Sequence, residues 1–546
     1  MKKNYLLFLL GIYLQCTSFA QCVENDEVKV LLVGDSWAFF MAADQTINNV
    51  LEKWGHSHYK YFTNTTLAEN GAETNDFLTA TKQDEIAAQL AANPSVEVVH
   101  LSIGGNDFLG DWNTSMTQTE VDSMIDSVEA RLILVMNFIK SVKPNIQILW
   151  SGYTYPNFEE IIESAAPFQT NHPYYSNWED MGFPTFLQIN DLLNKVSQRM
   201  EQYLLTDPQV HFINATGVLQ HTFGQNNPLG VPPSGTYAPY SAPLPLGFPN
   251  YPSPQNAMRN YLLTKDCFHL APQGFSDLLE YHTQKFYHKF LMDDFYTLAN
   301  GTHSGTVSSL GNVSNTLEMG ENNGENFSTL LSFDTQNMAD TTLLGASIFL
   351  RRESLVGTNP INNTLEIKVK KGNLGASAIV EADDYTATAD VTATPCLFGS
   401  NNGNKHWIRL DLPASFLPFI QQGNATQFLL SSPNASNGKV MFSDATNPDF
   451  APVLNLVYEK PTVALENKAD LESVINVYPN PTQNVCRIDA QGKKILSIQI
   501  FNAMGQLVGE GKAGNALISL ATFPTGIYTL QVKTEDGEAW KKVVKQ

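Results

Sequence analysis

Ser36 stands where an apolar run gives way to a helical pattern, directly after Gly34 and Asp35 in KVLLVGDS (29–36). A serine at the carboxyl end of a parallel strand lies at the sheet edge where α/β folds bind their ligands. The helix that begins there points its unpaired N–H groups and its dipole at the same place, which favours an alkoxide or oxyanion. Ser36 is therefore a candidate nucleophile, and the competing interpretation is a plain helix cap.

An acid and an imidazole occur near the end of the same region, in KDCFHLAPQGF (265–275). Asp266 precedes His269 by three residues, and Pro272 then opens a predicted helix. A carboxylate at this spacing can orient an imidazole and stabilise its charged form, and the imidazole can deprotonate a serine. Ser36, His269 and Asp266 thus have the residue types of a nucleophile, a general base and its orienting acid.

Two loops carry groups that could stabilise an oxyanion. ENGAET (69–74) places Gly71 ahead of a predicted helix, where a glycine lets the backbone approach a reacting group closely. HLSIGGNDF (100–108) ends a predicted strand and presents the Asn106 carboxamide, whose N–H can donate to a developing negative charge. A turn glycine and an Asx turn are the competing interpretations.

The elements that must position these residues alternate between strand and helix from residue 27 to about 297. Apolar, β-rich runs occur at 27–34, 96–104, 146–152 and 210–215. Residues 119–142 show apolar side chains at helical spacing, namely Val121, Met124, Ile125, Val128, Leu132, Val135, Met136 and Ile139. Such alternation predicts a parallel sheet covered by helices on both faces.

The helical period disappears after about residue 303. Residues 303–459 contain short alternating runs such as LEIKVKKG (365–372), divided by Gly, Asn and Pro, which predict an all-β sandwich. Residues 460–473 are a predicted linker, and 474–546 are a further β-rich domain. The proline-rich segment 223–255 is predicted to be a wall or lid of the site, or else a structural or disordered insertion.

Together, Ser36, Gly71, Asn106 and His269 resemble, in order, the signature of the SGNH, or GDSL-type, hydrolase family over residues 27–297. The resemblance implies a flavodoxin-like three-layer α/β domain with catalytic Ser36, Asp266 and His269. It also implies an oxyanion hole formed by Ser36, Gly71 and Asn106, with neither a metal nor an organic cofactor. The second glycine of the Gly-x-Ser-x-Gly elbow is absent, which separates the chain from the α/β-hydrolase pattern.

Two further resemblances concern the rest of the chain. VYPNP (477–481), NAMG (502–505) and PTGIY (524–528) closely resemble the type A sorting domain of type IX secretion in Bacteroidota, which implies a small β-sandwich recognised by that secretion machinery. The middle region faintly resembles DNRLRE-type and carbohydrate-binding jelly-roll modules, through STLLSFDT near its start and APVLNLVY at its end.

Composition and the first residues bear on the compartment. Residues 1–20 have a basic start, an apolar stretch and a small-residue cleavage site, as in a secretory signal peptide. No later segment is predicted to span a membrane, so we expect a secreted or cell-surface protein. A net charge of −21 argues against nucleic acid as a partner. The four cysteines after the signal peptide are scattered, which predicts no zinc site and leaves a single unassigned disulfide open.

The sequence therefore predicts a secreted serine ester hydrolase. The combination with a β-sandwich module suggests a carbohydrate esterase, such as a deacetylase of polysaccharide esters, although fold does not fix substrate. One alternative is a lipase or lysophospholipase, in which the proline-rich segment would face the acyl chain. A second is a surface binding or adhesion protein that has lost activity.

Overall fold

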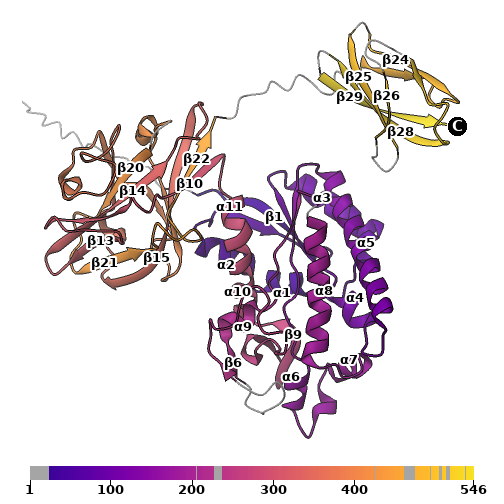
Figure 1. Ribbon diagram of the computed structural model, residues 1–546, viewed down its shortest axis with the longest axis horizontal. Helices are drawn as coiled ribbons and strands as arrows, with labels where there is room; N and C mark the ends of the chain where they lie inside the picture. The colour runs from indigo at the N-terminus through magenta and orange to yellow at the C-terminus, as the bar shows by residue number, and fades with distance from the viewer. Residues whose placement is uncertain are drawn as a thin grey trace, which may run out of the picture. The chain divides into compact units, whose positions relative to one another are not determined.

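The computed structural model describes residues 22, 24–204, 206–226, 236–422, 425–459, 474–491, 493–502, 507–511, 517–534 and 537–546. The predicted signal peptide (1–20) and linker (460–473) lie outside these ranges. The chain forms two compact units, Met1–Tyr458 and Glu459–Gln546. The first unit holds a parallel-sheet part and a β part (Figure 1).

The parallel-sheet part is built on five strands in the order β2-β1-β3-β4-β5, and every neighbouring pair is parallel. The strands are β1 (Glu27–Gly34), β2 (Tyr59–Phe62), β3 (Val98–Ser102), β4 (Gln147–Trp150) and β5 (Val210–Phe212). All residues of β3 and the last five of β1 are buried. A sheet covered on both faces requires apolar side chains at successive positions, which explains the continuous apolar runs in the sequence.

Helices cover both faces of this sheet, with α2 packed against α10 on one face and α3 against α5 on the other (Figure 1). The bounds are α1 (Ser36–Ala43), α2 (Thr46–Lys53), α3 (Ala80–Ala92), α4 (Gly105–Asp111), α5 (Gln118–Val142), α6 (Glu159–Glu163), α7 (Tyr175–Asp180), α8 (Phe186–Leu204), α9 (Val218–Phe223), α10 (Pro272–His282) and α11 (His288–Phe290). The predicted helix 119–142 is α5, and its eight predicted apolar positions are all buried. Thr117 and Glu120 form a capping box that fixes where this helix begins.

The β part has thirteen antiparallel strands within the described residues and a buried apolar core. The strands are β10 (Phe295–Leu298), β11 (Gly305–Ser308), β12 (Val313–Ser314), β13 (Leu317–Asn322), β14 (Glu325–Asp334), β15 (Leu343–Gly357), β16 (Glu366–Val369), β17 (Val391–Ala393), β18 (Cys396–Phe398), β19 (Trp407–Asp411), β20 (Ala425–Ser431), β21 (Gly438–Phe442) and β22 (Val453–Tyr458). Alternating burial along β16 and β21 agrees with the period-two pattern of the sequence.

The β part docks against the amino ends of the parallel strands. Trp54 and His288 pack on Trp407, with ring centroids 5.7 and 4.3 Å from it. Arg409 reaches across to Glu24, at 2.7 Å. Because Glu24 and Trp54 precede β1 and β2, this contact lies at the edge of the sheet opposite the one where Ser36 follows β1.

A disulfide between Cys22 and Cys396 ties the segment before β1 to the β part. The sequence left open whether a bridge exists and which cysteines form it, and the structure assigns this pair. Cys267 and Cys486 are free and buried.

The second unit contains a three-stranded and a four-stranded antiparallel sheet around a core that includes Ile498, Leu530 and Val532. Its strands are β23 (Asn476–Tyr478), β24 (Val485–Asp489), β25 (Ile495–Phe501), β26 (Leu507–Gly511), β27 (Leu517–Ser519), β28 (Gly526–Thr534) and β29 (Gly537–Lys545). Most of the NAMG turn lies outside the described residues, because the description stops at Asn502 and resumes at Leu507.

Candidate active site

Ser36 is the first residue of α1 and directly follows the end of β1. Gly34 makes this turn possible, because a Cβ on it would lie 1.9 Å from the carbonyl oxygen of Ser102 on β3. Asp35 caps the helix by accepting a hydrogen bond from the backbone N–H of Trp37 at 2.9 Å. Asp35 therefore performs the capping that the sequence could have assigned to Ser36, and the Ser36 hydroxyl has a different partner.

That partner is His269, whose Nε2 atom lies 2.7 Å from Ser36 Oγ. His269 stands on β9 (Thr264–Leu270), which forms a hairpin with β8 (Met258–Tyr261). The other ring nitrogen, Nδ1, lies 2.9 Å from Oδ2 of Asp266. With the proton on Nδ1, the imidazole donates to the carboxylate and Nε2 accepts from the serine hydroxyl.

Asp266 is held as an acceptor by several donors. Its Oδ1 atom accepts the backbone N–H groups of Phe268 and His269 at 2.9 and 2.7 Å, and Oδ2 also accepts from Tyr174 Oη at 3.0 Å. Burial alone would raise the pKa of Asp266, but the hydrogen bond and charge of His269 and the two backbone donors outweigh it. The pKa of Asp266 consequently lies below its ordinary value, so the carboxylate is ionised at neutral pH.

Aromatic rings surround the imidazole. Phe40 and Phe268 lie 4.9 and 4.3 Å from the His269 ring, centroid to centroid. Arg259 stacks over Phe40 and pairs with Asp44. His269 is 7% exposed, and both of its ring nitrogens have a partner.

Asn106 lies on α4, one residue after the helix begins at Gly105. Its Nδ2 atom donates to the carbonyl oxygen of Ala72 at 2.9 Å, which joins it to the loop that carries Gly71. A carboxamide nitrogen has two protons, so this contact leaves one for another acceptor. Ser36 and Asn106 line the same pocket, whereas Gly71 is exposed and is not among the residues that line it. Gly71 has a φ of +78°, the left-handed region that favours glycine.

A buried carboxylate that the sequence analysis missed, Asp107, holds the start of α4 and the loop that carries Gly71 together. Asp107 accepts from the backbone N–H and the hydroxyl of Thr74, at 3.0 and 2.5 Å. Arg131 of α5 donates to the same carboxylate at 2.9 Å and to Thr74 Oγ1 at 2.7 Å. The only sign of Asp107 in the sequence was its place next to Asn106. Thr74 lies 33 positions before Asp107 and Arg131 lies 24 positions after it, and no local pattern connects residues so far apart.

Tyr153 is a second residue that the sequence analysis missed. Its hydroxyl donates to Asp35 Oδ2, and its ring occupies the place where a Cβ on Gly105 would come within 2.7 Å. Burial raises the pKa of Asp35 to about 6 in spite of its hydrogen bonds from Tyr153 and Trp37. Gly105 thus leaves space for the ring of Tyr153, and Tyr153 in turn holds Asp35, the residue before Ser36.

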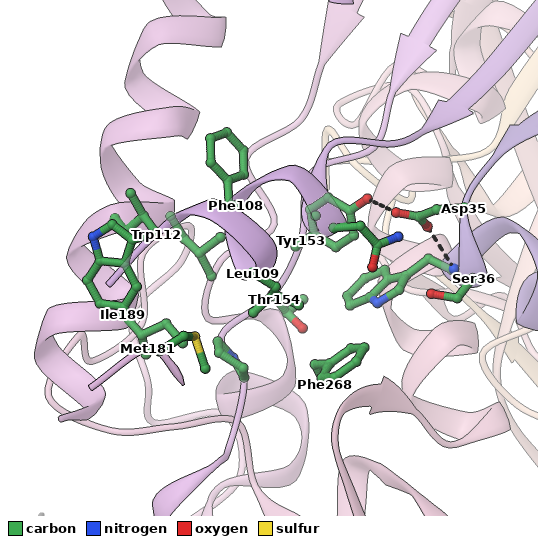
Figure 2. A pocket seen from close by; sticks show the side chains of 16 residues that line it. Asp35, Ser36, Phe108, Leu109, Trp112, Tyr153, Thr154, Met181, Ile189 and Phe268 are labelled. Atoms are coloured by element: carbon green, nitrogen blue, oxygen red, sulfur yellow. Dashed lines mark hydrogen bonds between the residues drawn. The ribbon is translucent and has the colours of Figure 1, made fainter. Parts of the chain in front are cut away.

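A pocket opens beside Ser36 and Asn106 (Figure 2). Its lining residues come from the parallel-sheet part: Asp35, Ser36, Trp37, Gly105, Asn106, Phe108, Leu109, Trp112, Tyr153, Thr154, Pro156, Met181, Ile189, Leu192, Leu193 and Phe268. None of the described residues of the proline-rich segment contributes, and 227–235 lie outside the description. Described residues of this segment are fastened elsewhere, for example by Asn190, which donates to Pro249 and Tyr251.

Other polar clusters have structural partners. His56 is buried and contacts His288 at 3.2 Å, and His58 contacts Arg409. Glu381 and Asp384 form a capping box on a short 3-10 helix. Within the described ranges, no cluster of His, Cys, Asp and Glu has an arrangement that could hold a metal ion.

Comparison with solved structures finds resemblances over about half of the chain. They include a family 3 carbohydrate esterase from Clostridium thermocellum (15% identity, 47% of this chain and 94% of that one, TM-score 0.25). They also include a GDSL-like lipase from Bacteroides thetaiotaomicron (14% identity, 48% of this chain and 89% of that one, TM-score 0.25). A third is the lipase Lip_vut3 from a goat rumen metagenome (11% identity, 48% of this chain and 98% of that one, TM-score 0.27). These identities and TM-scores are too low to assign a function to this chain. No curated protein matches the sequence.

The C-terminal unit has a clear match. Residues 476–546 match the family described as secretion system C-terminal sorting domain. Every helix in the described part of the chain is too short or too polar to cross a membrane. Because of the family match, residues 476–546 are a sorting domain. This domain directs the chain through type IX secretion to the cell surface or the extracellular space.

Proposed function

We propose that the chain is a serine ester hydrolase in which Ser36 is the nucleophile, His269 the general base and Asp266 the acid that orients it. The observation that carries this proposal is the unbroken series of contacts from Ser36 Oγ to His269 Nε2 (2.7 Å) and from His269 Nδ1 to Asp266 (2.9 Å). A serine alone is a weak nucleophile, and an imidazole in this position activates it.

In the acylation step, His269 takes the proton of Ser36 while Oγ attacks the ester carbonyl carbon. The tetrahedral intermediate bears a negative oxygen, which accepts hydrogen bonds from the Asn106 side chain and the backbone N–H of Ser36. Gly71 lies outside the pocket lining, but its loop is held to Asn106 through Ala72, and we assign its backbone N–H as the third donor at the rim. The ionised Asp266 stabilises the imidazolium that forms. His269 then gives its proton to the leaving alcohol, and the acyl group stays on Ser36.

Deacylation repeats these steps with water. His269 removes a proton from a water molecule, whose oxygen attacks the acyl-enzyme carbonyl. When the second tetrahedral intermediate collapses, the proton returns to Ser36 Oγ and the carboxylic acid leaves. Each turnover thus converts one ester and one water into one acid and one alcohol.

The prediction of a polysaccharide deacetylase rests on the combination of the hydrolase region with a β-sandwich module. The position of the β part gives this prediction no direct support. The described residues that line the pocket all lie in the parallel-sheet part, and the β part docks at the opposite edge of the sheet. The apolar pocket at Ser36 instead favours the lipase-type alternative, because an acetyl group needs no such space.

The test is hydrolysis of p-nitrophenyl acetate by the exported chain, with Ser36→Ala as the variant and Ser127→Ala, an exposed serine on α5, as its matched control. We expect activity in the wild type and in Ser127→Ala and its loss in Ser36→Ala. A fluorophosphonate probe should label the wild type at Ser36. Hydrolysis that survives Ser36→Ala, or a wild type that neither hydrolyses esters nor takes the label, would contradict the proposal, and the latter result would favour a binding protein.

A further inference from the structure

The pocket beside Ser36 is narrow, with a cavity volume of about 40 Å³. Ser36 and Asp35 lie at one end, and Trp112, Met181 and Ile189 lie at the other (Figure 2). Helices α4 and α8 supply most of the far wall, through Phe108, Leu109, Ile189, Leu192 and Leu193. The pocket thus leads from the proposed nucleophile into the space between two helices.

The chemistry of the lining selects what can enter. Beyond the residues next to Ser36, the side chains are apolar except for Thr154. Burying a hydroxyl or a charge there without a partner costs several kcal/mol, whereas burying methylene groups is favourable. A sugar ring with free hydroxyl groups is therefore a poor occupant, and a slender hydrocarbon chain is a good one.

The position of His269 decides which half of an ester this occupant belongs to. The leaving alcohol must lie next to His269 Nε2, which protonates it. Ser36 and Asn106 line the pocket, whereas His269 and Asp266 do not. A group inside the pocket is consequently attached to the carbonyl carbon on the side away from the imidazole, which makes it the acyl group.

Thr154 is the one lining residue with a side-chain hydroxyl outside the group next to Ser36. It is 3% exposed, and its Oγ1 atom has no hydrogen-bond partner among the described residues. Figure 2 places it between Leu109 and Phe268. A buried hydroxyl without a partner is costly, and an oxygen on the bound chain would supply the missing hydrogen bond.

We propose that the pocket binds the acyl chain of the substrate, a straight chain that carries a hydroxyl or keto oxygen beside Thr154. This inference rests on the proposed ester hydrolase function and names its acyl specificity. The alcohol half lies outside the pocket, on the side of His269.

The first test compares methyl octanoate with heptyl acetate, two isomers of equal composition that place the long chain on opposite sides of the carbonyl. Each methylene group moved from water into an apolar site is worth about fourfold in kcat/KM. We expect methyl octanoate to be hydrolysed about a hundredfold faster or more. Equal rates, or faster hydrolysis of heptyl acetate, would overturn the acyl assignment. If p-nitrophenyl acetate is not hydrolysed either, the proposed function itself fails.

The second test narrows the pocket. Leu109 is half-buried, so Leu109→Trp can extend its ring into the cavity with little disturbance of the core. We expect the ratio of kcat/KM for methyl octanoate to that for p-nitrophenyl acetate to fall about tenfold or more. Leu134→Trp, at an exposed position on α5, should leave this ratio as it is. An unchanged ratio in Leu109→Trp, with fluorophosphonate labelling proving that Ser36 is still accessible, would contradict the pocket assignment.

The third test concerns Thr154. Methyl hydroxyoctanoates with the hydroxyl at successive carbons are compared with methyl octanoate. We expect one position to be preferred by about fivefold or more in the wild type, and Thr154→Val, which has a similar shape, to lose that preference while it keeps the preference for the long chain. If the wild type prefers none of the hydroxylated chains, the claim that the acyl chain carries an oxygen beside Thr154 is wrong.

Discussion

Asp107 accepts hydrogen bonds from both the backbone N–H and the hydroxyl of Thr74, at 3.0 and 2.5 Å. This contact joins the start of α4, which carries Asn106, to the loop that carries Gly71. The oxyanion donors proposed here therefore depend on a carboxylate that does not itself face the substrate.

Asp107→Asn tests this dependence. Asp107 accepts three hydrogen bonds from Thr74 and Arg131 on its two oxygens. A carboxamide places an NH2 group where one oxygen was, so at least one of these buried donors loses its acceptor, and the free energy of unfolding should fall by about 1–3 kcal/mol. We expect kcat to fall about 10- to 100-fold through misplacement of Asn106, with a smaller change in KM. Thermal unfolding and steady-state kinetics measure the two effects. Asp126→Asn, at an exposed position, is the control, and an unchanged kcat in Asp107→Asn would refute the positioning role.

Asn106→Ala removes one proposed oxyanion donor. We expect a folded protein whose kcat is about 10²–10³-fold lower, because this hydrogen bond is needed mainly in the transition state. KM for a short ester should change little. The measurement is steady-state hydrolysis of p-nitrophenyl acetate, alongside Asn49→Ala on the exposed face of α2. A loss confined to KM would mean that Asn106 binds the substrate without stabilising an oxyanion.

Asp35→Asn tests the pKa of about 6 at Asp35. Between about pH 4 and pH 6, folded Asp35 keeps a proton that the unfolded chain has lost, so its contribution to the free energy of unfolding decreases as the pH rises. Asparagine does not titrate, and the variant should gain up to about 3 kcal/mol relative to the wild type from pH 4 to pH 7. Urea unfolding at several pH values measures this difference. A difference that stays constant with pH would show that Asp35 has an ordinary pKa.

Reduction of the Cys22–Cys396 disulfide should weaken the attachment of the β part. A bridge that closes so long a loop is worth about 2–5 kcal/mol. We expect dithiothreitol to lower the Tm of the wild type but not that of Cys396→Ser, which lacks the bridge from the start. Ester hydrolysis at room temperature should survive reduction, because the bridge attaches at the edge of the sheet away from Ser36. An equal drop in Tm in both proteins would assign the effect to something other than this disulfide.

Much of the site could be predicted because its parts are local in sequence. Asp266 and His269 are three residues apart on one strand, so their spacing alone keeps the two side chains close together. Ser36 follows a short apolar run rich in valine, which predicts a buried strand, and the carboxyl ends of parallel strands meet at one edge of a sheet. The period of 119–142 likewise determined which face of α5 is buried, since helical spacing alone places those eight residues together.

Tertiary structure decided what joins distant segments. The pairing of Asp107 with Thr74 and Arg131, the hydrogen bond from Tyr153 to Asp35, and the Cys22–Cys396 bridge each link residues with no shared local pattern. The sequence left the proline-rich segment open as a wall or lid of the site or as a structural or disordered insertion. Its described residues do not line the pocket beside Ser36, whose far wall comes mostly from α4 and α8. Residue types and periodicity report which side chains are buried and which could react. Which buried surfaces meet, and what shape of cavity they leave, depends on the packing of the whole chain.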